Sequence, residues 1–418
     1  MSQDEQSAFP RAWRIRCAAA FLCLLLACRL AGMIPIFREV LLAYLGVDDA
    51  AFGMLFSIGS AAGLLAILPG GVIADRKGPV SVIRVGMVGV AIAYVVLACT
   101  GASYWGMAAG FALYQCMMRP LGLAGNALLI RLFPNRKRRI ISLSNVVISG
   151  GDFMFPIVAE GLLFLTHRVP QITFAMVLHL PFALVAVVLL LGGALFRPQL
   201  STAGTAIHEP FRLRTVLRFR GRTWALILLC GAHGAADMLI FFWWARFMGS
   251  AVFPEQPIPP GFFLSGFAVS YFLARAALAA LPEHRWRRRL MVLPGLLGGA
   301  VLILGLLSRN YMLTGAAYIV GCFLWSSEMP TFLSRIAEQA EDRFGAALAA
   351  QQMTAAGLTA VGMWAMGRLI NALPEADMWK AMLVPAAVFP AIGLGGALWL
   401  WWNRRVEIGT GGPGVVSI

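Results

Sequence analysis

Long apolar runs recur along the whole chain and constrain its fold more than any other feature. A run of about 20 mostly apolar residues is long enough to cross the hydrocarbon core of a bilayer as a helix. Such runs fill most of the 418 residues, and only 13% of the residues are charged. That composition cannot supply the mixed surface of a soluble domain. The sequence therefore predicts an all-α membrane protein that crosses the bilayer many times.

The apolar runs fall into two sets of six, separated by the longest polar connection. The first set is expected at residues 15–37, 50–74, 80–100, 103–131, 140–165 and 172–196. The second set is expected at residues 223–246, 261–281, 290–308, 311–334, 345–372 and 379–403. We therefore expect 12 transmembrane helices, organised as an N-terminal six-helix bundle (1–196), a cytoplasmic linker (197–222) and a C-terminal six-helix bundle (223–418).

The basic residues behind the net charge of +15 are concentrated in every second connection between the expected spans. The connections on the opposite side hold only Arg38, Arg168, Arg246, Arg309 and Lys380. Because cytoplasmic loops carry an excess of arginine and lysine, both termini are expected in the cytoplasm. The first span has no cleavage site, so we expect it to be retained in a cytoplasmic (inner) membrane. No stretch interleaves basic with exposed aromatic residues, which argues against nucleic acid as a partner.

Within the central linker, residues 209–222 mix four large apolar residues with five arginines. This pattern fits a short amphipathic helix that lies on the anionic cytoplasmic leaflet. It fits a plain solvated linker equally well, and the sequence leaves both interpretations open.

The connection between the second and third spans carries the most specific motif of the chain. It reads Gly70-Gly71-Val72-Ile73-Ala74-Asp75-Arg76-Lys77-Gly78. Gly71 is expected to let two helices approach closely, and Gly78 to permit the tight turn. Asp75 is a fixed anion near the membrane surface, suited to a helix N-terminus or an arginine. This glycine-x-x-x-aspartate-arginine-x-glycine pattern, after the second of twelve spans, resembles the loop signature of the major facilitator superfamily.

The resemblance implies two pseudosymmetric six-helix bundles that move solutes by alternating access. It also implies a gating role for Gly71, Asp75, Arg76 and Gly78, because the family's aspartate pairs with a neighbouring helix end in one conformation and releases it in the other. A merely structural turn is the alternative. Residues 119–125 resemble the family's fourth-span arginine motif, with the glycine one place early. Span five echoes the antiporter signature only loosely, which leaves the direction of transport open.

Small residues are expected to bring helices together. Gly59 and Gly63 lie four residues apart on one face of span two, and Ala356 and Ala360 have the same spacing in span eleven. In the resembled fold these two spans are neighbours between the lobes, so close packing suits both.

Charged residues inside the expected spans are the main candidates for a site. A charge in the hydrocarbon region is costly, so each one needs a partner or a watery cavity. Glu160 and Arg368 are expected near span ends, within reach of water. Six others lie deeper: Arg29, Arg119, Asp152, Asp237, Arg275 and Glu328.

The resemblance places spans one, four, seven and ten around a central cavity. Arg29 then faces Asp237 and Arg119 faces Glu328, so the first lobe offers positive charge and the second offers negative charge. An anionic group of a solute is expected on the two arginines, while Asp237 or Glu328 takes a proton or holds a solute cation. The alternative is that these charges pair with one another and close the empty cavity.

Two further residues support these candidates. His233 lies one helical turn before Asp237, which suits either a proton relay or a packing hydrogen bond. Asp152 in span five is expected to face Arg119 as a supporting pair. His179 in span six is interpreted as structural.

The sequence thus predicts a secondary active transporter, coupled to protons, that takes up a small anionic or zwitterionic solute. Proton-driven efflux of a drug or metabolite is the alternative, and an integral-membrane enzyme or a non-transporting sensor is a remote one. No loop gathers a reactive cluster of an enzyme, and no G-x-x-x-x-G-K phosphate loop is present. The seven cysteines show no metal-ligand spacing, so no metal or cofactor is expected. The expected partners are the solute, protons and the bilayer, with the chain acting as a monomer.

Overall fold

The computed structural model describes residues 10–133, 137–196, 219–280, 286–340 and 344–409, and all regular structure within these ranges is helical. The first half contains α1 (Arg11–Ala27), η2 (Leu30–Met33), α2 (Arg38–Leu45), α3 (Asp49–Lys77), α4 (Pro79–Cys99), α5 (Tyr104–Leu132), α6 (Lys137–Arg168) and α7 (Phe174–Leu195). The second half contains α9 (Gly221–Met248), α10 (Pro260–Ala280), α11 (Arg287–Leu290), α12 (Leu293–Ser308), α13 (Tyr311–Trp325), α14 (Glu328–Ala340), α15 (Phe344–Ala372), η5 (Glu375–Asp377) and α16 (Met378–Gly409). Most of the expected linker and its amphipathic segment lie outside the described residues.

The helix count is consistent with the twelve expected crossings. Among the described residues, eight helical segments are long and apolar enough to cross a membrane. The helices α5, α6 and α15 are 29, 32 and 29 residues long. At about 1.5 Å per residue they exceed the hydrocarbon thickness, although they carry more polar residues. The remaining expected crossing, at residues 311–334, corresponds to α13 and the start of α14.

Two of the expected spans are broken helices, which the apolar pattern did not reveal. The first span divides into α1 and η2, with Arg29 as the residue that precedes η2. The tenth divides at Ser326 and Ser327, whose hydroxyls donate to the carbonyls of Phe323 and Leu324. Serine hydroxyls that bond to the backbone offer it an alternative to the helical ladder, and this permits the interruption. A charged residue adjoins each break, Arg29 at the first and Glu328 at the second.

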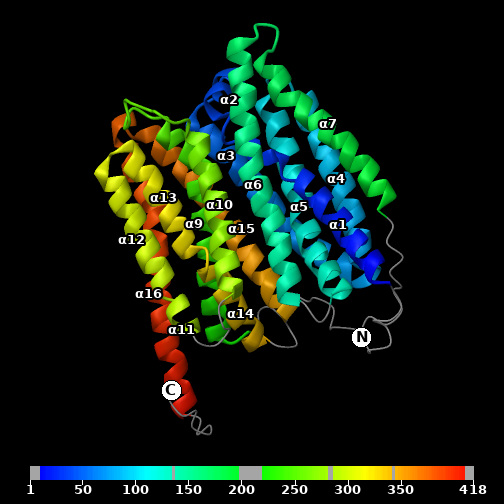
Figure 1. Ribbon diagram of the computed structural model, residues 1–418, viewed down its shortest axis with the longest axis vertical. Helices are drawn as coiled ribbons and strands as arrows, with labels where there is room; N and C mark the ends of the chain where they lie inside the picture. The colour runs from blue at the N-terminus through cyan, green and yellow to red at the C-terminus, as the bar shows by residue number, and fades with distance from the viewer. Residues whose placement is uncertain (1–9, 134–136, 197–218, 281–285, 341–343, 410–418) are drawn as a thin grey trace.

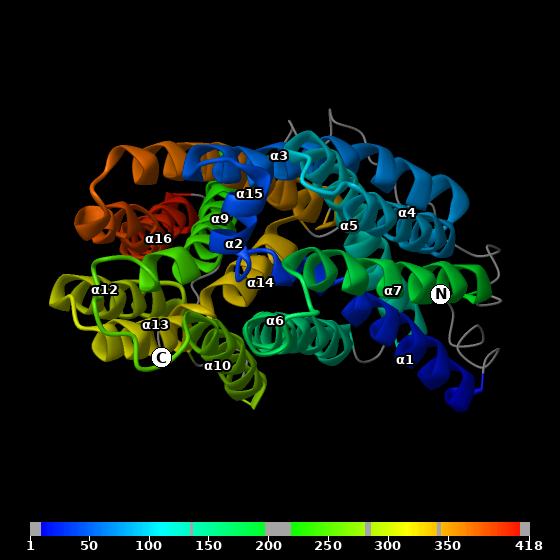
Figure 2. The ribbon, with the colours of Figure 1, turned by 90° about the horizontal axis from the view of Figure 1, so that it is seen from above.

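The helices form two groups that meet along two seams (Figures 1 and 2). Within the first half, α3 and α4 pack on α5, and α4 packs on α7. Within the second half, α9 packs on α15 and α16, and α12 packs on α13 and α16. The seams are α3 against α15 and α6 against α10. These pairs join spans two with eleven and five with eight. The expected contact between spans two and eleven is therefore confirmed.

The two ends of the bundle differ. Helix α1 begins and α16 ends at the lower end in Figure 1, which we call the terminal end. At the opposite, far end, a Cβ on Gly53 would lie 2.5 Å from the carbonyl oxygen of Met363 and 3.0 Å from Gly367 Cα. Ser57 Oγ donates to Ala360 O in the same seam at 2.6 Å. The absence of side chains at two glycines thus lets α3 and α15 touch at the far end.

The glycines expected to mediate this contact face elsewhere. A Cβ on Gly59 would meet the Phe111 ring, and one on Gly63 would lie 3.1 Å from Arg119 Cγ. Both neighbours belong to α5, within the same half. The expectation of close packing is correct for Gly59 and Gly63, but the partner is α5 and not span eleven. The spacing of the glycines shows that one face of the helix allows close packing. The rotation of the helix decides which neighbouring helix packs on that face.

We predict that Gly53→Ala lowers the melting temperature of the detergent-solubilised protein by a few degrees. Alanine has the better helix propensity by up to about 1 kcal/mol, but overpacking against rigid backbone costs about 1–3 kcal/mol. Gly161→Ala in α6 is the matched control, because nothing lies within 4 Å of a Cβ there. A Gly53→Ala protein as stable as the control would contradict the close approach of α3 and α15.

Candidate functional site

The loop motif is confirmed as a tight turn, with one correction. Gly78 separates α3 from α4 with φ of 81°, a left-handed conformation that favours glycine. Gly71 was expected to allow a close helix approach, but nothing lies within 4 Å of a Cβ built there. That role belongs to the preceding Gly70, whose Cβ would collide with the Pro120 ring on α5. The side chains of Asp75 and Arg76 lie outside the described part of the chain, so their gating role stays a prediction.

A cavity of roughly 320 Å³ lies between the two halves. Its walls come from the break between α1 and η2, from α3, α5 and α6, and from α9, α10, α14 and α15. Four charged residues line it among those described: Arg29, Arg119, Asp237 and Arg275. Three positive charges and one negative charge therefore face the same space.

Arg29 and Arg119 contribute the positive charge of the first half, as expected. Both line the cavity, and they are close enough for their charges to repel each other. Arg119 Nη1 donates to Gln352 Oε1 on α15 at 3.4 Å, a bond between the halves. Its Nε has no hydrogen-bond partner among the described residues. The side chain of Asp152, the expected partner of Arg119, is not described.

Asp237 is a buried carboxylate at the cavity wall. It accepts a hydrogen bond from the Tyr271 hydroxyl and another from Trp325 Nε1 at 3.1 Å. The Arg275 guanidinium carbon lies 4.6 Å from the centre of the Tyr271 ring, a cation–π contact. The second lobe was expected to offer negative charge, but Arg275 adds a positive charge to it. The sequence signal for this cluster is the i,i+4 spacing of Tyr271 and Arg275, which places both on one face of α10.

His233 and Glu328 do not line the cavity, contrary to expectation. His233 Nδ1 lies 3.2 Å from Glu328 Oε2, and both side chains are fully buried. Glu328 Oε1 accepts from the Gly295 backbone N–H at 2.9 Å. The expected bond between His233 and Asp237 is not formed. The break before α14 brings Glu328 against α9, so the imidazole finds its partner behind the wall of the cavity.

Glu160 makes a contact that its position near a span end did not suggest. Its carboxylate accepts the Gly261 backbone N–H at 3.0 Å, at the start of α10. A carboxylate at a helix N-terminus is favourable because it meets unpaired N–H groups and the positive end of the helix dipole. This contact ties α6 to α10 across the second seam. Arg368 is exposed, as expected.

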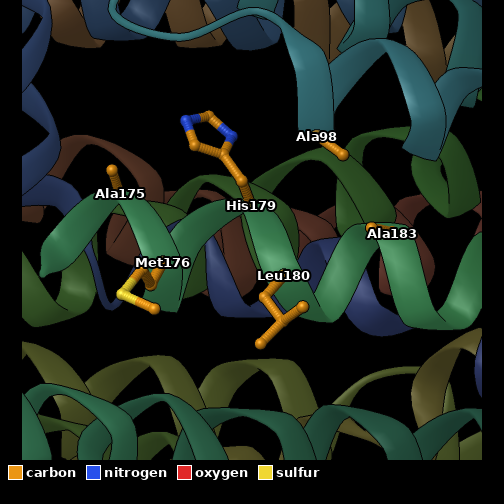
Figure 3. Close-up of a pocket in the computed structure, with 6 residues that line it drawn as sticks. All are labelled: Ala98, Ala175, Met176, His179, Leu180 and Ala183. Carbon is orange, nitrogen blue, oxygen red and sulfur yellow. The ribbon is translucent and has the colours of Figure 1, made fainter. Parts of the chain in front are cut away.

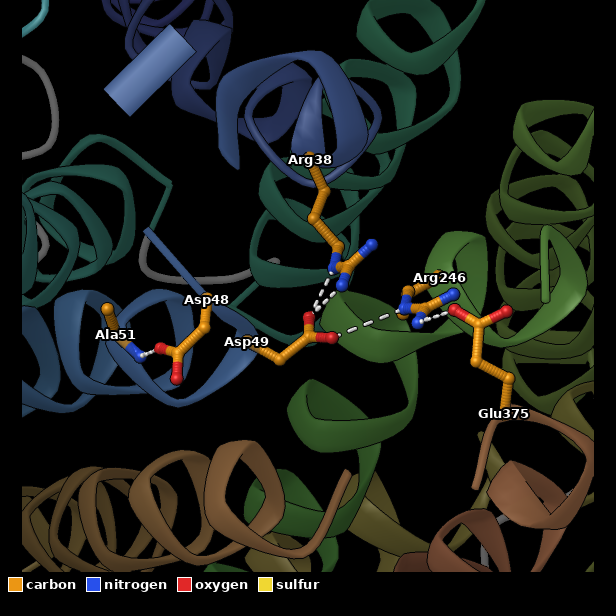
Figure 4. A network of polar contacts seen from close by, with 6 residues as sticks. All are labelled: Arg38, Asp48, Asp49, Ala51, Arg246 and Glu375. Carbon is orange, nitrogen blue, oxygen red and sulfur yellow. Dashed lines mark hydrogen bonds and ion pairs between the residues drawn. The ribbon is translucent and has the colours of Figure 1, made fainter. Parts of the chain in front are cut away.

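An ion network joins the two halves at the far end (Figure 4). Asp49, the first residue of α3, accepts from Arg38 Nε at 2.7 Å and from Arg246 Nε at 3.4 Å. Arg246 Nη2 also donates to Glu375 Oε1 at 2.6 Å. Burial lowers the pKa of the Arg38 guanidinium, and its contact with Asp49 opposes that shift. The residue before Asp49 is Asp48, which caps α3 by accepting the Ala51 N–H at 2.8 Å.

This network was not among the sequence candidates. Arg38 and Arg246 were counted only as charges in connections, because each lies at the end of an apolar run. The available signal was that Arg38, Asp49, Arg246 and Glu375 all fall at span ends on the same side of the membrane. Spacing along the chain could not show that they meet, since 197 positions separate Asp49 from Arg246.

A second hollow, of roughly 380 Å³, lies at α7 and the end of α4 (Figure 3). It is lined by Ala98, Ala175, Met176, His179, Leu180 and Ala183. His179 Nδ1 lies 2.8 Å from the Leu97 carbonyl oxygen, and Nε2 lies 3.3 Å from the Tyr44 hydroxyl. Both ring nitrogens therefore have partners, which agrees with a structural role. The apolar lining offers few groups to orient a solute, so the central cavity is the candidate site.

Comparisons with known proteins agree with this arrangement. The family model described as Major Facilitator Superfamily matches residues 19–363. The chain is also similar in structure to a variant of the fucose:proton symporter FucP of E. coli, with a TM-score of 0.64 and 15% sequence identity. That similarity covers 93% of this chain and 98% of the symporter. A search of curated proteins finds no match.

We predict that Asp49→Asn lowers the free energy of unfolding by about 3–5 kcal/mol, because the buried Arg38 loses its anion and Arg246 keeps only Glu375. Asp377→Asn is the matched control: its ion pair with Lys380 is 2.9 Å long, and its side chain is 35% exposed. Such surface pairs contribute about 0–1 kcal/mol. Thermal unfolding in detergent compares the two. Equal melting temperatures in the two variants would argue against a stabilising network.

Proposed function

The chain belongs to the major facilitator superfamily, and from this membership we propose that it is a proton-coupled transporter that takes up a small anionic or zwitterionic organic solute. Membership makes the chain an integral membrane transporter and not an enzyme. The observation that carries the finer proposal is the central cavity, with three arginines and one buried carboxylate among its described lining.

The charge of the cavity favours an anion. Arginine presents several N–H donors in a planar fork that matches a carboxylate, so Arg29, Arg119 and Arg275 together suit one or two acidic groups. The volume of roughly 320 Å³ lies within the range of small-molecule sites. A zwitterion fits as well, because Asp237 can hold an ammonium group.

The position of Asp237 supports coupling to protons. Its carboxylate repels an anionic solute that enters the same cavity, and a bound proton removes that repulsion. Proton and anion then each raise the affinity for the other by the same factor, since binding linkage is reciprocal. The buried His233–Glu328 pair is a second candidate for the coupling proton. The similar E. coli protein is a fucose:proton symporter, which supports coupling by analogy of fold alone.

Alternating access accounts for the difference between the two ends. The far end is closed by the ion network, by Gly53 on Gly367 and by Glu160 on Gly261. The lining extends toward the terminal end through Asn126 and Ser144. We infer an inward-facing conformation, in which the bundles 1–196 and 223–418 rock about the site while residues 70–78 gate the terminal end.

The same proposal places the protein in its membrane. Because basic residues concentrate in the connections of the terminal end, we infer that this end and both termini are cytoplasmic, in a cytoplasmic (inner) membrane. One chain supplies every described wall of the cavity, which supports a monomeric unit.

Proton-driven efflux remains the second candidate, and the aromatic lining favours it. Phe111, Tyr114, Phe241, Phe242 and Phe267 all line the cavity. Aromatic side chains offer large apolar contact areas that suit drugs and other aromatic compounds. The two candidates differ in the direction in which the proton moves relative to the solute.

Proteoliposomes that contain a pH-sensitive dye test both candidates. We expect external pools of small organic anions or zwitterions to acidify the lumen, and Arg119→Ala to weaken this response about 10- to 100-fold, because a charge-assisted bond is lost. Glu338→Gln, which removes a partly exposed pair with Arg335, is the control and is expected to leave the response unchanged. Alkalinisation by cationic drugs would instead support efflux. Solute uptake without any pH change would refute proton coupling.

A second experiment locates the coupling proton. We expect Asp237→Asn to abolish accumulation driven by a pH gradient and to retain exchange of labelled for unlabelled solute, because the neutral amide mimics the protonated acid. Glu328→Gln is measured in parallel, with Glu338→Gln as the control. Normal accumulation by Asp237→Asn would exclude this carboxylate, and its loss in Glu328→Gln alone would assign coupling to the pair with His233.

A further inference from the structure

Gln351 on α15 stands out among the residues that line the cavity. The residue is 1% exposed, yet neither the amide oxygen nor the amide nitrogen of its side chain has a hydrogen-bond partner among the described residues. The next residue, Gln352, is engaged by Arg119 across the seam. One of two adjacent glutamines therefore bonds across the seam, while the other lines the cavity with an amide that no described residue bonds.

An unpaired buried amide costs free energy, because both its donor and its acceptor have lost water without gaining a partner. Native proteins keep few such groups, and each one needs a reason. Gln351 is located where a bound solute would supply the missing bonds. The amide therefore indicates which polar groups the ligand carries.

The chemistry of the amide narrows what that ligand carries. A glutamine side chain offers two N–H donors and one acceptor oxygen. A carboxylate can only accept, and an ammonium group can only donate, so neither satisfies both ends of the amide through a single group. A hydroxyl group both donates and accepts, and it is small enough to approach a buried side chain.

Two guanidinium groups that line the same cavity add positive charge beside the amide. The Nε atoms of Arg119 and Arg275 are buried and also lack hydrogen-bond partners among the described residues. They come from α5 and α10, on the opposite halves, and α15 supplies the amide. Arginine N–H groups suit carboxylate oxygens, while the amide suits a group that is not ionised.

We propose that Gln351 is a specificity-determining residue that binds a hydroxyl group of the transported anion, so that the solute is a small hydroxylated carboxylate. This inference rests on the proposed uptake of an anion and names the substrate class of that site. A solute without the hydroxyl leaves the amide unpaired, and sites built to bond a hydroxyl discriminate strongly against analogues that lack it.

The test compares acids that differ mainly in their hydroxyl groups: lactate with propionate, malate with succinate, and gluconate with hexanoate. Binding is measured in detergent by the rise in melting temperature with each acid, and transport is measured in proteoliposomes. We expect the protein to prefer the hydroxylated member of at least one pair by about tenfold or more. In Gln351→Met, which keeps the length of the side chain, that preference is expected to fall to within about twofold because the hydrogen bonds are lost.

Thr354→Val is the matched control. Thr354 is on the same helix, α15, but is not among the residues that line the cavity, and its hydroxyl donates to the Ala350 carbonyl oxygen at 2.9 Å. The preference is expected to persist in this variant. Gln351→Asn, which retains the amide on a shorter side chain, is expected to keep part of it.

A stability measurement separates a binding role from a structural one. Without solute, Gln351→Met is expected to melt at the same temperature as the parent or higher, because no unpaired amide remains buried. A lower melting temperature together with an unchanged preference would overturn the proposal and make Gln351 a structural residue.

The outcomes also separate this inference from the proposed function. If no acid of either kind binds or moves, uptake of an organic anion is refuted. Alternatively, acids bind and move without any preference for the hydroxylated member, or with a preference that Gln351→Met retains. Either result refutes only the role of Gln351.

Discussion

Charges inside the membrane-crossing helices require a partner or a hydrated space, and the arrangement of the two halves follows from this requirement. At the far end Asp49 is shared between Arg38 and Arg246, so the charges of both halves neutralise one another. Behind the cavity wall His233 meets Glu328. Around the central cavity, three arginines and one carboxylate are the charged residues among the described lining. In the proposed function an anionic solute balances this excess of positive charge, which would link binding to the equilibrium between the two ends of the transporter.

The interruptions of two helices position these groups. Arg29 precedes η2 at the break in the first span, and Glu328 begins α14 after the break in the tenth. A continuous helix would distribute such residues around its circumference at the regular helical angle. A break releases the backbone locally, which is tolerated at membrane depth only where protein or a water-filled cavity surrounds it. Broken helices at the centre of a transporter are also where ions and solutes are commonly bound.

Much of the fold could be predicted from the sequence because it depends on local properties. The length of an apolar run sets whether a helix can cross the bilayer, and the alternation of basic connections predicts its direction. The loop 70–78 identified the family, and Gly78 adopts the expected turn. The cavity charges Arg29, Arg119 and Asp237 were also candidates, since a charged residue within an apolar run is conspicuous without any structure.

Which groups meet was decided only by the tertiary structure. Gly71 faces open space while Gly70 packs on Pro120, a difference of one helical position that rotates a residue by about 100°. His233 pairs with Glu328 and not with Asp237, because the break before α14 redirects the carboxylate. The network of Asp49 and the cluster around Tyr271 join residues from distant helices, and the amide of Gln351 has no hydrogen-bond partner among the described residues. A sequence records hydropathy and spacing along one helix, whereas contacts between helices depend on their rotation, tilt and interruption, which only the packed bundle determines.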